Sequence, residues 1–206
     1  MQEDAHKWNK RYEDGFMPTE PSPFVLQACA YIKESFPALS LPHWLTQEPL
    51  VALDIACGNG RNAKLLAQIG FEVDGVDISS IALKHLENLA HINPILADLD
   101  NFNLARNRYS VVLNSFFLDR RLFAPILACL KPNALILFET FIDIYSHTPK
   151  NDKALYNGEL EHIFSPQNGF SILHNETYEN ASIERKATYP HIVRFIAHYT
   201  QKALNK

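Results

Sequence analysis

The chain contains 206 residues, of which 47% are hydrophobic and 20% are charged, and its formal net charge is −4. This length and composition predict one globular domain whose core needs neither metals nor disulfide bonds. The negative charge disfavours nucleic acid as a partner, because proteins that bind phosphate backbones usually present a basic face.

Neither targeting nor membrane insertion is indicated by the sequence. No apolar run reaches the roughly 18 to 20 residues that span a bilayer, and the start MQEDAHKWNK is too polar for a signal peptide. Cys29, Cys57 and Cys129 lack CxxC spacing, and their odd number suits packing in a reducing compartment better than a disulfide or zinc site. We therefore expect a cytoplasmic protein without membrane contact and without a metal.

Residues 1–45 are predicted to form a helical cap or lid. After a polar helical start, residues 17–24 (MPTEPSPF) contain three prolines, which cannot continue a helix and so indicate an extended crossing. A second helix is expected to begin near Ser22.

Residues 50–140 alternate between short apolar runs and helix-length amphipathic segments. The strand-like runs are 51–56, 71–77, 93–100, 108–117 and 133–141, and the helix-like segments are 62–70, 79–90 and 120–130. This alternation is typical of βαβ units that form a parallel sheet. Ser79 or Ser80 can cap the second of these helices, and Gly70 can end the first.

Residues 141–206 follow a different pattern. A loop and one helix are expected within 150–164, whereas 169–179 and 190–200 are strand-like with no helix-length segment between them. Such a pair should form an antiparallel hairpin. The sequence therefore predicts a single α/β domain over residues 1–206, with five parallel strands followed by a β-hairpin.

A glycine-rich loop follows the first predicted strand. Residues 58–63 (GNGRNA) match the pattern G-x-G-x-x-A, a permitted variant of the dinucleotide fingerprint, so an NAD-type oxidoreductase remains an alternative. Glycines at a helix N-terminus let backbone N–H groups approach a ligand, and either a diphosphate or a carboxylate fits there.

Acidic residues stand at the ends of three successive predicted strands. If ionised, Asp54 repels a diphosphate but attracts a ligand that carries an ammonium group beside its carboxylate, as an amino acid does. Asp77 lies 19 residues after Gly58, where an acid can accept both ribose hydroxyls, and Asp98 can accept from an adenine amine. Ligands of open α/β sheets bind outside the carboxyl ends of the strands, so these acids indicate one site.

These segments resemble the class I S-adenosylmethionine-dependent methyltransferases. ALDIACGNGRNA resembles their first motif, VDGVDIS the ribose-binding second, ADLD the adenine-binding third, YSVVLNSFF the fourth, and LKPNALILFETF the segment before the fifth strand. The N-terminal W-x-x-R-Y is similar to the tellurite-resistance and thiopurine methyltransferase-like branch. Two glycine positions differ, because Ala56 replaces the first loop glycine and Asn133-Ala134 replace the double glycine after Lys131-Pro132.

The resemblance implies a Rossmann-like methyltransferase fold with a seven-stranded, mainly parallel sheet, an antiparallel last strand and helices on both faces. It implies S-adenosylmethionine as cofactor and S-adenosylhomocysteine as product. The implied cofactor-binding residues are Asp54, Ala56, Cys57, Gly58, Gly60, Arg61, Asp77, Ile78, Asp98, Leu99 and Asn114, together with Trp8, Arg11 and Tyr12 of the N-terminal helix. Trp8 and Tyr12 are four residues apart and should share one helix face, either as core packing or as a lid over the cofactor.

The methyl acceptor is predicted to be a small molecule that binds after the fourth and fifth strands. Candidate residues there are Phe116, Arg120, Arg121, Glu139, Tyr145 and His147. Arg120 and Arg121 can clamp an anion or pair with a carboxylate of the chain itself, and His147 can equally be an exposed loop residue. A catalytic base is not indicated, and a monomer and a homodimer both remain open. A non-catalytic cofactor-binding sensor or assembly protein is the second alternative.

Overall fold

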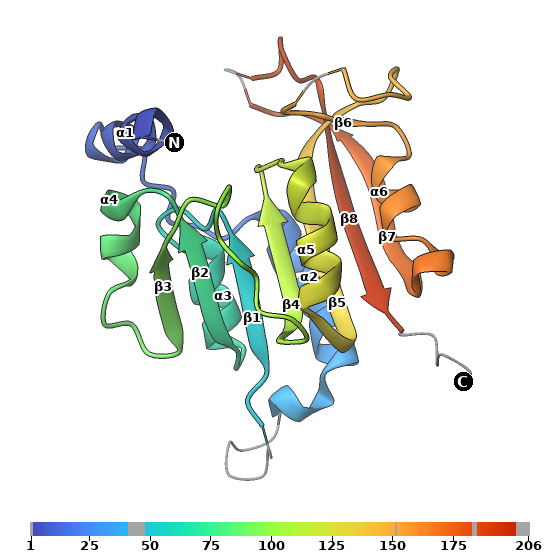
Figure 1. The fold of residues 1–206 in the computed structure, drawn as a ribbon, viewed down its shortest axis with the longest axis horizontal. Helices are drawn as coiled ribbons and strands as arrows, with labels where there is room; N and C mark the ends of the chain where they lie inside the picture. Colours follow the sequence, from blue (N-terminus) through green and yellow to red (C-terminus); the bar gives the residue numbers. More distant parts are fainter. Residues whose placement is uncertain (1, 41–47, 151, 183–184, 201–206) are drawn as a thin grey trace. The chain divides into compact units, whose positions relative to one another are not determined.

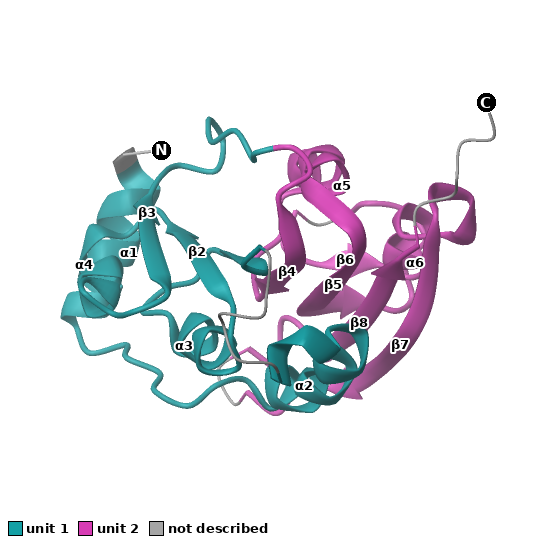
Figure 2. Ribbon diagram, turned by 90° about the horizontal axis from the view of Figure 1, so that it is seen from below, with its two compact units in different colours: residues 1–105 teal, residues 106–206 magenta. Residues whose placement is uncertain are grey.

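A computed structural model describes residues 2–40, 48–150, 152–182 and 185–200. The chain divides into two compact units, Met1–Ala105 (unit 1) and Arg106–Lys206 (unit 2), which are coloured separately in Figure 2. Residues 41–45 of the predicted cap and residues 201–206 lie outside the described ranges. Among the described helices, none has the length and apolar character needed to cross a membrane.

Unit 1 begins with the two predicted helices and the crossing between them. Helix α1 spans Gln2–Glu13, α2 spans Pro23–Ser35, and the short 3-10 helix η1 spans Pro37–Ser40. Ser22 caps α2, because its hydroxyl oxygen accepts a hydrogen bond from the Phe24 N–H at 3.2 Å. Helix α1 thus ends at Glu13, before the proline-rich segment, and α2 begins beside Ser22, where the sequence predicts.

The sheet of unit 1 consists of three parallel strands in the order β3-β2-β1. The strands are β1 (Val51–Ile55), β2 (Glu72–Asp77) and β3 (Ile92–Leu96), and α3 (Arg61–Gln68) connects β1 to β2. Parallel register pairs Asp54 with Gly75 and Asp77 with Leu96. In Figure 1 the three arrows end at the same edge, and α1 lies there beside α4 (Ser80–Leu83).

The connection between β2 and β3 is less helical than the predicted segment 79–90. Helix α4 is followed by the 3-10 turn η3 (Lys84–Leu86), and no helix continues beyond it. Asn88 and His91 adopt positive φ angles of 62° and 64°, a conformation that an α-helix excludes. The predicted cap is confirmed, because the Ser79 hydroxyl oxygen accepts from the Ala82 N–H at 3.1 Å.

Unit 2 contains the remaining strands in the order β4-β5-β8-β7, with β6 paired to β5. Its elements are β4 (Tyr109–Ser115), η4 (Arg120–Leu122), α5 (Phe123–Cys129), β5 (Leu130–Asp143), β6 (Leu155–Tyr156), α6 (Glu159–Ile163), η5 (Pro166–Asn168), β7 (Phe170–Glu179) and β8 (His191–Tyr199). β4 and β5 are parallel, whereas β8 is antiparallel to both β5 and β7. The C-terminal hairpin is thus confirmed, and the two-residue strand β6 is an addition that no sequence pattern indicated.

Two positions where the resembled family carries glycine keep the glycine conformation here. Ala56 has a φ of 53° and Asn133 a φ of 64°, both in the left-handed region. Asn tolerates this region better than other residues with a Cβ, whereas Ala is strained there. The backbone of both turns is therefore maintained although the glycines are absent.

Because Asn133 is exposed, its substitution tests this conformation without a change in core packing. We expect Asn133→Val to lower the free energy of unfolding by about 1–3 kcal/mol, since a β-branched residue is strained at positive φ. Asn133→Gly should change it by less than about 1 kcal/mol. Urea unfolding of the three proteins measures this, and equal stability of the Val and Gly variants would contradict the assigned backbone.

Candidate functional site

Asp54 is buried at the end of β1, directly before the glycine loop of residues 56–60. Its side chain is 1% exposed, and its Oδ2 atom has no hydrogen-bond partner. Burial, and secondly the negative charge of Asp77, raise the pKa of Asp54 to about 8, although Arg61 and the backbone N–H of Ala63 oppose the shift. The carboxyl group is therefore mostly protonated at pH 7. The expected repulsion of a diphosphate by an ionised Asp54 is correspondingly reduced.

Asp77 is the last residue of β2 and joins two loops. Its Oδ2 accepts a hydrogen bond from the Gly58 N–H at 2.7 Å, and its Oδ1 accepts from the Ser79 N–H at 2.8 Å. Burial raises the pKa of Asp77, while these backbone donors lower it. The carboxylate thus orients the glycine loop and the start of α4 relative to each other.

The two loop glycines serve packing as well as backbone conformation. A Cβ atom on Gly58 would lie 2.2 Å from the Tyr12 hydroxyl oxygen, and one on Gly60 would lie 2.2 Å from Leu86 Cδ2. The N–H of Gly58 is directed to Asp77 and that of Gly60 to the Cys57 carbonyl. The N–H groups of the two glycines themselves thus bind within the chain, and the expected approach of backbone N–H groups to a ligand stays a prediction.

The third acidic residue lies beyond the end of its strand. Asp98 follows Leu96 by two residues, is partly exposed, and accepts a hydrogen bond from the Asp100 N–H at 3.0 Å. Its loop is joined to the second strand, because the Ala97 N–H donates to the Asp77 carbonyl at 3.0 Å. Ile78 and Leu99, the residues after Asp77 and Asp98, are both half-buried. The three predicted acids thus occur at neighbouring strand ends within unit 1.

The proline-rich crossing is bound to the glycine loop and the start of α3. Three polar side chains of this region each bind a backbone atom of the crossing: Asn59 Nδ2 the carbonyl of Pro18 (2.9 Å), an Arg61 guanidinium nitrogen the carbonyl of Glu20 (3.3 Å), and Asn62 Oδ1 the N–H of Ser22 (2.9 Å). In this structure Arg61 donates to the crossing, and its predicted contact with the cofactor stays a prediction.

Helix α1 carries an aromatic and cationic face, and its Tyr12 lies against Gly58 of the same loop. The rings of Trp8 and Tyr12 lie 6.4 Å apart, as expected for residues on one helix face. The Arg11 guanidinium carbon lies 4.2 Å from the ring centre of Phe16 and 5.6 Å from that of Trp8. Arg11 Nε is buried without a hydrogen-bond partner. Burial, and secondly Asp77, raise the pKa of the Tyr12 hydroxyl.

In unit 2, two predicted residues occupy the end of β4. Asn114 is buried, and its Oδ1 atom has no hydrogen-bond partner. Phe116 is 37% exposed and has a φ of 56°, which is strained for a bulky residue. Its N–H donates to the Glu139 carbonyl at 2.6 Å, and its ring lies 5.3 Å from that of Phe141. Strained residues concentrate at functional sites, so Phe116 is the strongest acceptor-side candidate.

The two adjacent arginines each pair with a carboxylate of the chain. Arg120 makes a two-pronged contact with the buried Glu159, at 2.6 and 2.9 Å, and also donates to the Ala154 carbonyl. Arg121 binds Asp119 and thereby lowers the pKa of that carboxyl. These pairs favour the structural interpretation of both arginines over an anion clamp.

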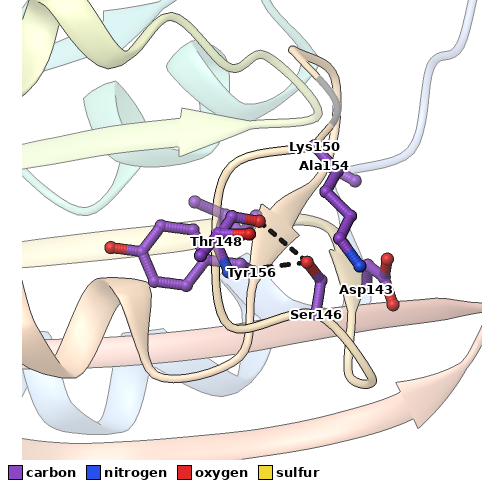
Figure 3. A pocket seen from close by; sticks show the side chains of 7 residues that line it. Asp143, Ser146, Thr148, Lys150, Ala154 and Tyr156 are labelled. Carbon is purple, nitrogen blue, oxygen red and sulfur yellow. Dashed lines mark hydrogen bonds between the residues drawn. The ribbon is translucent and has the colours of Figure 1, made fainter.

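The other acceptor-side candidates are more exposed. Tyr145 is 82% exposed and lies edge-on to His191, and His147 is exposed in the loop after β5. A small pocket nearby, shown in Figure 3, is lined by Asp143, Ser146, Thr148, Lys150, Ala154, Leu155 and Tyr156. The Ser146 hydroxyl donates to the Thr148 carbonyl there, and neither Tyr145 nor His147 lines the pocket.

Comparison with known proteins identifies the domain that contains these loops. Residues 52–133 match the family model described as a methyltransferase domain. No curated protein matches the chain in sequence.

Solved structures share the fold at low sequence identity. TehB from Haemophilus influenzae is 17% identical, with 93% of this chain and 66% of that chain covered and a TM-score of 0.65. A methyltransferase from Methanosarcina mazei is 18% identical over 78% of this chain and 97% of its own, with a TM-score of 0.58. The 1,6-didemethyltoxoflavin-N1-methyltransferase of Burkholderia thailandensis, solved with that compound and S-adenosylhomocysteine, is 16% identical over 86% and 88%, with a TM-score of 0.55.

The expected fold and enzyme class are thereby confirmed. The chain has the Rossmann-like methyltransferase fold, with mainly parallel strands and an antiparallel last strand. Residues 52–133 match a methyltransferase domain, and the Burkholderia structure, which shares the fold, contains S-adenosylhomocysteine.

The shifted pKa of Asp54 predicts how stability depends on pH. In the unfolded chain this carboxyl titrates near 3.8 and in the folded protein near 8, so folding takes up a proton between these values. Its stabilising contribution is complete below about pH 4 and is lost as the pH rises through about 8. Asp54→Asn cannot ionise and should lose less stability than the wild type between pH 5 and pH 8.5. Urea unfolding at several pH values measures both slopes, and equal slopes would show that Asp54 is not the group responsible.

Proposed function

We propose that the protein transfers the methyl group of S-adenosylmethionine to a small-molecule acceptor. The observation that carries this proposal is a complementary pair of unsatisfied buried atoms in unit 1. Arg11 Nε can only donate a hydrogen bond, and Asp54 Oδ2, when the carboxyl group is ionised, can only accept one. Neither atom has a hydrogen-bond partner among the described residues. Buried polar groups are normally satisfied, so such atoms indicate a missing ligand.

The amino-acid end of S-adenosylmethionine has the chemistry that these two atoms require. Its ammonium group can donate to Asp54, and a cation beside this carboxyl favours the ionised form despite burial. Its carboxylate can accept from Arg11, and charge-assisted bonds of this kind are short and strong. Asp77 would hold the ribose, because each of its oxygens has a lone pair beyond the one used by Gly58 or Ser79.

Helix α1 supplies the exclusion of water that methyl transfer requires. When bound, the cofactor would supply a sulfonium methyl group, whose carbon the acceptor attacks in line while the carbon–sulfur bond breaks and S-adenosylhomocysteine leaves. The protein then contributes mainly positioning and a dry site. Trp8, Arg11 and Tyr12 share one face of α1, and the Tyr12 hydroxyl of that face lies against Gly58. Aromatic faces also attract a sulfonium cation, by about 0.5–2 kcal/mol. We propose that residues 1–20 act as a lid.

A small acceptor is supported by the chemistry of unit 2 and by the fold neighbours. Phe116, directly after β4, offers a partly exposed aromatic ring on a strained backbone, and Asn114, two residues earlier, offers a side-chain carbonyl oxygen without a hydrogen-bond partner. The Burkholderia neighbour was solved with a small-molecule acceptor. The net charge of −4 gives no support to a nucleic-acid substrate.

The cofactor assignment predicts a selective gain in thermal stability. S-adenosylhomocysteine should raise the melting temperature, because a ligand that binds only the folded state stabilises it, whereas NADH should not. Differential scanning fluorimetry with both ligands at equal concentrations measures this. Equal or greater stabilisation by NADH would overturn the assignment in favour of an oxidoreductase. Stabilisation by S-adenosylhomocysteine without methylation of any screened acceptor would favour a non-catalytic cofactor-binding protein.

The lid predicts protection of the N-terminus from proteolysis. Lys7 and Lys10 are exposed on α1, so trypsin should cut there readily without ligand and more slowly with S-adenosylhomocysteine. Mass spectrometry of the early fragments measures both rates. Equal protection in both states would show that α1 is a fixed part of the core, and equal cleavage would show that it does not cover the cofactor.

A further inference from the structure

We infer that Asn9 is a positioning residue for the Asp77 carboxylate and that it acts through Ser79. This inference rests on the proposed function, because it assigns to Asp77 the contact with the cofactor ribose. Asp77 accepts hydrogen bonds from the backbone N–H groups of Gly58 and Ser79. Helix α1 contacts both of these residues, one through Asn9 and the other through Tyr12.

The contact of Asn9 with Ser79 is a specific hydrogen-bond arrangement. Asn9 Oδ1 accepts from the Ser79 hydroxyl at 2.8 Å and from the Ile81 N–H at 3.3 Å. The Ser79 hydroxyl oxygen in turn accepts from the Ala82 N–H, as the cap of α4. Because both partners of Asn9 here are donors, only its carbonyl oxygen fits, which fixes the orientation of the amide. Ser79 is therefore held by its hydroxyl while its N–H is directed to Asp77.

The contact of Tyr12 with Gly58 lies one helical turn further along α1. Tyr12 follows Asn9 by three residues, so both side chains can lie on the same face of the helix. The Tyr12 hydroxyl is so close to Gly58 that a Cβ atom there would lie 2.2 Å from it. Any larger residue at position 58 would displace Tyr12. Together, the two contacts form a brace, defined as Asn9 and Tyr12 against Ser79 and Gly58.

The brace explains how two loops that are separate in the sequence hold the Asp77 carboxylate in one orientation. Gly58 belongs to the loop after β1 and Ser79 to the loop after β2, and each donates to a different oxygen of Asp77. With both N–H groups fixed, the remaining lone pairs of Asp77 point in fixed directions. The carboxylate is then preorganised, which lowers the cost of ligand binding.

Isotope-labelled protein without ligand provides the first test. In Asn9→Ala, amide hydrogen exchange at Ser79 and Ile81 should become at least about fivefold faster, because the acceptor that holds this turn is lost. Asn9→Asp keeps an acceptor oxygen at the same place and should restore the wild-type rates. Lys10→Ala, on the exposed side of the same helix, is the matched control and should leave the rates unchanged. Unchanged rates in Asn9→Ala would overturn the brace.

Calorimetry with S-adenosylhomocysteine provides the second test. Loss of a hydrogen bond worth about 1–2 kcal/mol corresponds to roughly 5- to 30-fold weaker binding, which we expect for Asn9→Ala, with Asn9→Asp and Lys10→Ala within about threefold of wild type. In an Asp77→Asn background, Asn9→Ala should have less than about a twofold effect, because residues that act on one group are not additive. Additive effects would show that Asn9 merely anchors the helix and would overturn the positioning role.

The two measurements separate failure of the inference from failure of the proposed function. If the wild type does not bind S-adenosylhomocysteine, the proposed function fails, and the exchange rates without ligand still decide whether the brace exists. If exchange changes but affinity does not, the brace exists without positioning Asp77, and the inference is wrong.

Discussion

The candidate site depends on one unfavourable arrangement, in which two carboxyl groups, Asp54 and Asp77, are buried and the charge of Asp77 makes the ionisation of Asp54 more costly. Burial is the largest cause of the raised pKa of both groups, and Asp77 adds to the shift of Asp54. The two groups differ in the hydrogen bonds that offset the cost of their burial. Asp77 receives two backbone N–H donors, whereas one oxygen of Asp54 receives none. This difference is what the proposed contact of Asp54 with a cationic amino-acid head group rests on.

Much of the fold was predictable because local patterns and tertiary packing agree. Apolar runs at β1, β2, β4 and β5 are buried nearly throughout, so hydrophobic periodicity alone locates them. The exception is the segment after Ser79, where the pattern indicates a helix to residue 90 but the backbone leaves the helical region at Asn88. Asn is one of the few residues that tolerates positive φ, yet it also occurs within helices, so its identity alone does not reveal the break.

The positions of the candidate site residues on strand ends and turns were predictable, but the side chains that contact them were not. The positions of the acids follow from strand ends, and the loop glycines follow from their spacing. The side chain that packs against each glycine does not follow from the spacing. Tyr12, which packs against Gly58, lies 46 residues before it, and Leu86, which packs against Gly60, lies 26 residues after it. Asn9 was missed for the same reason. A single polar residue on a polar helix carries no pattern, and the only available signal was its place beside Trp8 in the W-x-x-R-Y segment.

The polar residues of the glycine loop show why a motif need not describe a ligand contact alone. Asn59, Arg61 and Asn62 each form a hydrogen bond with the backbone of residues 18–22. These three side chains therefore bind the chain's own N-terminal crossing. The crossing connects α1 to α2, and its attachment places α1 against the loop. The same short stretch thus provides the turn after β1 and the anchor of the helix that covers it. In such a case the spacing of a motif reflects two constraints, the geometry of the turn and the docking of the N-terminus, and only the first is shared with dinucleotide-binding loops.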